Sequence, residues 1–255
     1  MTEPLFLPPV IGHRGAAALA PENTLAALRA AAAAGVAMVE FDATLTADGV
    51  PIVLHDETLD RTTNGSGALD DIPAAVIAGL DAGAWFDARF AGEPVPTLEA
   101  VLITAADLGL AVNVEIKPCP GRDAETAAAV LATTRAVWPG GRSGDRPVPL
   151  VSSFSRTALR VAADTVPDWP RGYLIWDRPD DWAAFADAIG ATTLNISPAR
   201  STAEEMAGYL ANGRPVAAFT VNDPAIAQRL WADGVGAVIT DDPGLMLTAR
   251  AAYAQ

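Results

Sequence analysis

The stretch "LTADGVPIVLHD" (residues 45–56) decides how many strands belong to the central sheet. Residues 50–54 have the composition of a strand, but the Asp-Gly link at 48–49 is far too short for a parallel crossover. We therefore predict that residues 44–54 form a hairpin that extends the preceding strand and then reverses. The returning arm ends at His55, so the hairpin brings this imidazole back to the end of that strand.

Outside the hairpin, short β-rich runs alternate with alanine-rich helical runs. The predicted strands cover residues 10–14, 37–43, 110–117, 148–154, 172–176, 193–197, 216–221 and 237–241. Helices are predicted between them, the first with Asn23 or Thr24 as N-cap and a later one with Thr97 as N-cap. Eight strands that alternate with helices over 255 residues are typical of an α/β protein with a TIM (β/α)8 barrel.

Residues 56–95 interrupt this alternation because they are rich in turn-forming residues. We expect them to form a small insertion over the top of the barrel after the second strand, not a separate domain. Residues 1–255 are therefore predicted to form a single barrel domain, and residues 139–147 an ordinary surface loop.

The composition excludes several classes of function. A formal net charge of −14 argues against nucleic-acid binding and against binding to an anionic membrane surface. No run of about 18 uncharged apolar residues occurs, so membrane insertion is not expected. The first ten residues lack the pattern of a signal peptide, and the single cysteine, Cys119, excludes an intramolecular disulfide. We expect a cytoplasmic location; the sequence indicates no oligomeric state.

The two histidines, His13 and His55, and the only lysine, Lys117, all fall at predicted strand ends. In a TIM barrel, the carboxyl ends of the strands surround the active site. Arg14 follows His13 and adds a second positive charge there. Each residue alone is more often structural, but their coincidence favours a catalytic site. An imidazole exchanges protons near neutral pH, and arginine and lysine suit a phosphate group.

Three carboxylates are predicted at the same end of the barrel. Glu40 and Asp42 are two positions apart, so they share one face of the second strand, and Glu115 ends the neighbouring strand. Carboxylates this close repel one another unless a cation lies between them. Ligands that are all oxygen suit Mg²⁺, Ca²⁺ or Mn²⁺ better than zinc. The sequence therefore predicts one divalent metal ion beside a site for a small phosphate-containing molecule.

Several motifs occur in the order seen in the glycerophosphodiester phosphodiesterase family. They include "GHRG" (12–15), "VEFD" (39–42), "IVLHDETLDRTTNGSG" (52–67), "VEIK" (114–117) and "VGAVITDDPG" (235–244). The chain resembles the short soluble bacterial form of this family over nearly its whole length. The resemblance implies a TIM barrel with an insertion after the second strand, and metal-dependent hydrolysis of a glycerophosphodiester to sn-glycerol 3-phosphate and an alcohol.

The resemblance also implies roles for the residues at the strand ends. Glu40, Asp42 and Glu115 are expected to bind the metal ion. His13 and His55 are expected to act as general base and general acid. Arg14 and Lys117 are expected to contact the phosphate. Phe154, Phe219 and Asn222 are expected to line the substrate pocket, where the family often has tryptophan in place of Phe219.

Other functions remain open from the sequence. A related metal-assisted phosphodiesterase could stop at a cyclic phosphate. An aldolase-type barrel would use Lys117 to form a Schiff base. A non-catalytic binding protein is a third alternative. The Asp-Asp pairs at 70–71, 180–181 and 241–242 are predicted to be helix caps and solvated turns.

Overall fold

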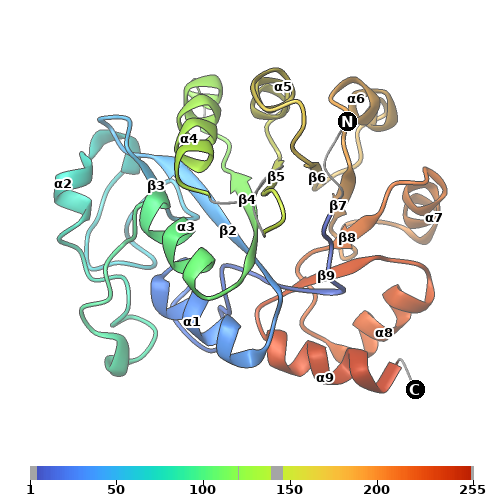
Figure 1. The fold of residues 1–255 in the computed structure, drawn as a ribbon, viewed down its shortest axis with the longest axis horizontal. Helices are drawn as coiled ribbons and strands as arrows, with labels where there is room; N and C mark the ends of the chain where they lie inside the picture. Colours follow the sequence, from blue (N-terminus) through green and yellow to red (C-terminus); the bar gives the residue numbers. More distant parts are fainter. Residues whose placement is uncertain (1–4, 120, 139–145, 254–255) are drawn as a thin grey trace.

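The computed structural model describes residues 5–119, 121–138 and 146–253. Within these residues the sheet has nine strands, and all except the antiparallel β3 (Pro51–Val53) form a closed parallel barrel (Figure 1). The barrel strands are β1 (Val10–Gly12), β2 (Met38–Leu45), β4 (Ala111–Ile116), β5 (Leu150–Ser153), β6 (Arg171–Ile175), β7 (Thr193–Ile196), β8 (Val216–Ala218) and β9 (Ala237–Thr240). Pairing of β1 with both β9 and β2 closes the ring. The predicted TIM barrel is confirmed.

Helices alternate with the strands and surround the barrel (Figure 1). They are α1 (Leu25–Ala34), α3 (Leu98–Asp107), α4 (Asp123–Val137), α5 (Arg156–Thr165), α6 (Trp182–Ala188), α7 (Ala203–Ala211), α8 (Pro224–Ala232) and α9 (Pro243–Tyr253). Of the two N-caps considered for α1, Thr24 is the one used, and it accepts a hydrogen bond from the Ala27 amide; Thr97 caps α3 in the same way. Gly35 ends α1 at φ 88°, a left-handed conformation that favours glycine.

The inward face of β2 changes from apolar to acidic toward its carboxyl end. Side chains alternate along a strand, so Met38, Glu40 and Asp42 point to the same side. The register with β4 places Ala111 beside Met38 and Glu115 beside Asp42. Met38 and Ala111 belong to an apolar cluster inside the barrel. The acidic side chains therefore lie closer to the carboxyl ends of the strands than this apolar cluster does.

The predicted hairpin is confirmed, since β3 pairs antiparallel with the end of β2. The insertion that follows contains η1 (Leu69–Asp71), α2 (Ala74–Ile77) and η2 (Ala88–Phe90). The insertion and the returning arm of the hairpin share an apolar cluster, formed by Ile52, Leu54, Leu59, Leu69, Ile77, Ala82 and Val95. In Figure 1 the part around α2 lies at one edge of the ring of helices, beside β3 and α3, and not across the middle of the ring. A carboxylate oxygen of Glu93 accepts a hydrogen bond from the Ala26 amide, which ties the insertion to the first turn of α1.

No helix in the part of the chain that the structure describes has both the length and the apolar character needed to cross a membrane. The surface loop predicted for residues 139–147 lies mostly outside the described residues.

Candidate active site

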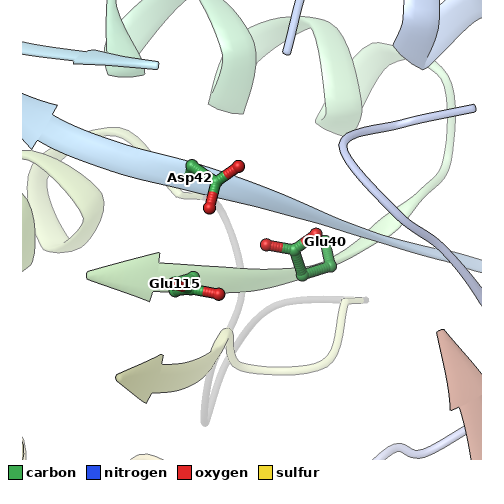
Figure 2. Close-up of side chains that lie close together, drawn as sticks. All are labelled: Glu40, Asp42 and Glu115. Atoms are coloured by element: carbon green, nitrogen blue, oxygen red, sulfur yellow. The ribbon is translucent and has the colours of Figure 1, made fainter. Parts of the chain in front are cut away.

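Glu40, Asp42 and Glu115 form a buried carboxylate cluster. Each side chain offers one oxygen, and these oxygens lie within 4.8 Å of one another. Figure 2 shows the three carboxylates gathered from the neighbouring strands β2 and β4. The residues are only 3%, 1% and 8% exposed, respectively. The structure thus brings together the three carboxylates that the sequence predicts, although each would repel the others.

The charges in this cluster are only partly compensated. Oε1 of Glu40 is buried and has no hydrogen-bond partner. Burial, followed by the charge of Asp42, raises the pKa of Glu40 to about 8. The same two causes raise the pKa of Glu115. An orphaned carboxylate oxygen beside two other buried carboxylates is the arrangement that a divalent cation with oxygen ligands satisfies, so the cluster fits such a metal ion.

Asp42 remains ionised, although it is the most buried of the three. Burial alone would raise its pKa, but Lys117 and then Arg14 lower the pKa well below the usual value for aspartate. Lys117 Nζ lies 3.4 Å from Asp42 Oδ1, and Arg14 Nε lies 3.2 Å from Asp42 Oδ2. Asn23 adds a hydrogen bond from its side-chain amide to Oδ2, at 2.8 Å. Asp42 is therefore the fixed negative charge of the site, with a cation on each side.

Lys117 and Glu115, which are two positions apart, form an ion pair. Lys117 Nζ donates to Glu115 Oε1 at 2.9 Å. Burial would lower the pKa of Lys117, but Asp42 and Glu115 raise it, so the pKa lies above the usual value for lysine. Lys117 is therefore a charged ammonium group and not the neutral amine that a Schiff base requires.

His13 lies directly after β1 and pairs with an aspartate at the end of β9. Its Nδ1 is 2.6 Å from Asp241 Oδ1. Arg14 Nε donates to His13 Nε2 at 3.2 Å, which requires a lone pair on Nε2 and so assigns the proton to Nδ1. Burial lowers the pKa of His13, but the hydrogen bond to Asp241 and the charge of Glu40 outweigh it, so the pKa is raised.

The turn after β1 depends on glycine. A Cβ atom on Gly12 would lie 2.1 Å from the carbonyl oxygen of Gly15, closer than any side chain can approach. This tight turn holds Arg14 at φ 49°, and its amide donates to Glu40 Oε2 at 3.1 Å. The Arg14 guanidinium reaches Glu22, with Nη1 2.5 Å from Oε1. The backbone of "GHRG" thus directs both His13 and Arg14 into the site.

His55 arrives from the hairpin, as the sequence predicts. The amide of Leu54 donates to the carbonyl of Asp42 at 3.0 Å, which holds the returning arm against β2. Nδ1 of His55 is 2.6 Å from Asp56 Oδ1, and the side chain is 35% exposed. Burial lowers the pKa of His55; Asp42 and Asp56 raise it, and Lys117 lowers it, with a net decrease.

Two cavities open beside the carboxylate cluster. The first has a volume of about 470 Å³, and its lining includes His13, Arg14 and Asp241. The second has a volume of about 320 Å³, and its lining includes His55 and Lys117. None of the three carboxylates lines either cavity, but Arg14 and Lys117, one in each lining, both contact Asp42. The arrangement offers one imidazole and one positive charge on either side of the cluster.

The three predicted pocket residues occupy different positions. Asn222 lines the first cavity and donates to Asp241 Oδ2 at 2.6 Å. Phe154 and Phe219 pack edge to face, with centroids 5.7 Å apart, and both contact the half-exposed ring of Trp176. Phe154 follows β5, Phe219 follows β8 and Trp176 follows β6, so all three rings lie at the carboxyl end of the barrel. None of them lines either of the two cavities.

Several residues of the site are not predicted from the sequence. The prediction that the pair 241–242 forms a cap or solvated turn is wrong for Asp241, which binds His13, and right for Asp242, which caps the start of α9. Glu22, Asp56 and Arg61 are not among the residues that the sequence predicts for the site. The available signal for Asp241 was its position at the end of the last strand, because a closed barrel places that strand beside the first.

Comparison with known proteins identifies the family. The model of the glycerophosphoryl diester phosphodiesterase family matches residues 13–245. A glycerophosphodiester phosphodiesterase of Caldanaerobacter subterraneus is 33% identical over 249 residues, which cover 93% of this chain and 96% of the relative. A phosphodiesterase structure from Oleispira antarctica, in complex with the product sn-glycerol 3-phosphate, has a TM-score of 0.91 and 36% identity, and the match covers 96% of this chain and 98% of that one.

A second solved structure agrees with this comparison. The glycerophosphodiester phosphodiesterase of Agrobacterium tumefaciens has a TM-score of 0.73 and 31% identity, with 95% of this chain and 100% of that chain covered. The residues that the family model matches include β2 and β4, which carry the three carboxylates, and also His13, Arg14 and Lys117. The protein is therefore an enzyme of the glycerophosphoryl diester phosphodiesterase family.

Proposed function

We propose that this enzyme hydrolyses glycerophosphodiesters to sn-glycerol 3-phosphate and an alcohol. The observation that carries the proposal is the geometry around Asp42: a carboxylate cluster with one cation and one imidazole on either side. The Oleispira antarctica phosphodiesterase, which is similar over nearly its whole chain, binds sn-glycerol 3-phosphate as product. A small phosphodiester therefore suits the mouth of this barrel better than a large or uncharged substrate.

Glu40, Asp42 and Glu115 would hold one divalent cation, with Mg²⁺ or Ca²⁺ preferred and Mn²⁺ also compatible with the ligands. When bound, such an ion polarises a phosphoryl oxygen and offsets negative charge in the transition state. Arg14 and Lys117 are positioned to bind the phosphate from its two sides. Their side chains are only 15% and 13% exposed, so the charge of a bound phosphate would be poorly screened by solvent.

His13 would act as general base and His55 as general acid. The Nε2 lone pair of His13 is already assigned by the Arg14 contact, and Asp241 holds the opposite nitrogen. A raised pKa makes His13 the stronger proton acceptor, and a lowered pKa makes protonated His55 the stronger proton donor. Because its pKa is lowered, only part of the His55 population is protonated at neutral pH.

The test is a steady-state assay with glycerophosphocholine, in which glycerol 3-phosphate is the readout and Mg²⁺, Ca²⁺, Mn²⁺ and chelator are compared. Chelator should abolish the activity and a divalent ion should restore it. Glu115→Gln should require a higher metal concentration; an unchanged metal titration would remove Glu115 from the ligands. Phosphorus NMR of the product separates complete hydrolysis from the related reaction that ends at a cyclic phosphate.

A further inference from the structure

Arg61, in the insertion, binds two carboxylates that come from different parts of the chain. Nε and Nη2 donate to the two oxygens of Asp56 at 2.6 and 3.0 Å. Nη1 and Nη2 donate to the two oxygens of Glu22, both at 2.7 Å. This double fork uses the planar geometry of the guanidinium group, which a lysine side chain cannot reproduce.

Each of these carboxylates has a second partner in the active site. Asp56 Oδ1, which accepts from Arg61 Nη2, is also 2.6 Å from His55 Nδ1. Glu22 Oε1 contacts Arg14 Nη1. Glu22 lies in the loop between β1 and α1, so it anchors Arg61 to the barrel. One continuous network therefore runs from the barrel, through Arg61 and Asp56, to the imidazole of His55.

The exposure of this network indicates a positioning role and not a stabilising one. The side chain of Arg61 is 45% exposed, and those of Asp56 and Glu22 are 24% and 11% exposed. Ion pairs with a solvent-exposed partner contribute little to stability. The hydrogen bonds from Arg61 instead fix the orientation of the Asp56 carboxylate, because they hold both of its oxygens. They thereby fix the position of the oxygen that faces His55.

We propose that Arg61 is a positioning residue for phosphodiester hydrolysis. It holds Asp56 so that the imidazole of His55 keeps the orientation required for proton transfer, and Glu22 holds Arg61 against the barrel. The inference rests on the proposed role of His55. It assigns to the insertion a part in catalysis, since a residue six positions beyond the histidine locks the histidine in place.

The test is a double-mutant cycle on Arg61→Met and His55→Ala, with kcat and KM measured for glycerophosphocholine and Mg²⁺. Arg61→Met should lower kcat about 10- to 100-fold, a fraction of a full acid–base contribution, and change KM less than about 3-fold. In the His55→Ala background the same substitution should cost less than about 2-fold, because the residue through which it acts is absent. The melting temperature should change by no more than about 2 °C.

Two further variants complete the test. Arg61→Lys keeps the charge but loses the fork, so its kcat should remain well below that of the unmodified enzyme. Arg89→Met is the matched control: Arg89 lies in the same insertion, is 76% exposed and pairs with Asp87, and its removal should leave kcat unchanged. If Arg61→Met is unfolded, Asp56→Asn can be measured in its place, in the unmodified enzyme and in His55→Ala. It tests whether the network acts through His55.

The outcomes separate the two proposals. If Arg61→Met keeps full kcat, or costs the same factor with and without His55, Arg61 does not act through His55 and the inference is wrong. If His55→Ala itself keeps full activity, the proposed role of His55 fails, and the inference fails with it.

Discussion

The two halves of the site hold their histidines in different ways. His13 is 17% exposed and is held by Asp241, which lies 228 positions away in the sequence but directly after β9, the strand that pairs with β1. His55 is 35% exposed and is held by the adjacent Asp56, which Arg61 of the insertion fixes. The barrel thus builds one half and the insertion builds the other. The difference shows that the insertion supplies part of the site that the barrel alone cannot.

The largest effect is expected where the two halves meet. Asp42 contacts Arg14 on one side and Lys117 on the other, so Asp42→Asn removes a proposed metal ligand and the counter-charge of both cations. We expect kcat/KM for glycerophosphocholine to fall about 10⁴-fold or more, because a bound metal ion alone contributes several kcal/mol to transition-state stabilisation. Asp87→Asn, an exposed carboxylate of the insertion, is the control and should behave as the unmodified enzyme. An Asp42→Asn variant with ordinary activity would show that the two halves of the site do not depend on the Asp42 carboxylate.

The next prediction distinguishes the two histidines. His13→Ala and His55→Ala should each lower the rate roughly 10²- to 10⁴-fold, the usual size of a general acid–base contribution. If His55 protonates the leaving alcohol, its loss should matter much less for a p-nitrophenyl diester, whose leaving group needs no proton. The loss at His13 should be similar for both substrates. The opposite pattern would show that His55 is the general base and His13 the general acid.

A smaller effect tests the barrel half alone. Asp241 raises the pKa of His13, so Asp241→Asn should lower that pKa. A general base must be unprotonated, and the variant therefore keeps its base form down to lower pH. The titration midpoint of the His13 imidazole, followed by NMR, should move to lower pH, and kcat/KM should fall about 10- to 100-fold at the optimum. Asp242→Asn, which removes only the helix cap beside it, should leave this midpoint in place. A midpoint that does not move in Asp241→Asn would show that Asp241 does not raise the pKa of His13.

The smallest effect concerns stability without the metal ion. The folded pKa of Glu40 is about 8, above its ordinary value of 4.5, so its contribution to stability is complete below pH 4.5 and is lost as the pH rises toward 8. In chelator, Glu40→Gln should become more stable than the unmodified protein between these pH values, by a few °C in melting temperature. The difference should vanish near pH 4. A constant difference across this range would mean that Glu40 is not held in the protonated form.

Much of the fold follows from local sequence signals. The Asp-Gly link between β2 and β3 gives the hairpin, and Thr24 and Thr97 provide the helix caps. The spacing of Glu40 and Asp42 places both on one face of a strand, whatever the rest of the chain does. These features depend on residues that are close together in the chain, and such features can be predicted without coordinates.

The residues that hold the site in position could not be predicted in this way. Asp241 reaches His13 only because the barrel closes, and Glu22 reaches Arg61 across 39 positions. Asp56 is next to His55, but its role depends on Arg61, and an aspartate beside an arginine is common on protein surfaces. Tertiary contact, and not the identity of each residue, makes these side chains part of the site.

The most direct measurement is the anomalous diffraction of Mn²⁺ in a crystal grown with glycerol 3-phosphate. We expect one strong peak between the carboxylates of Glu40, Asp42 and Glu115, with the phosphate beside it in contact with Arg14 and Lys117. A peak bound elsewhere, or a phosphate held away from this cluster, would contradict it.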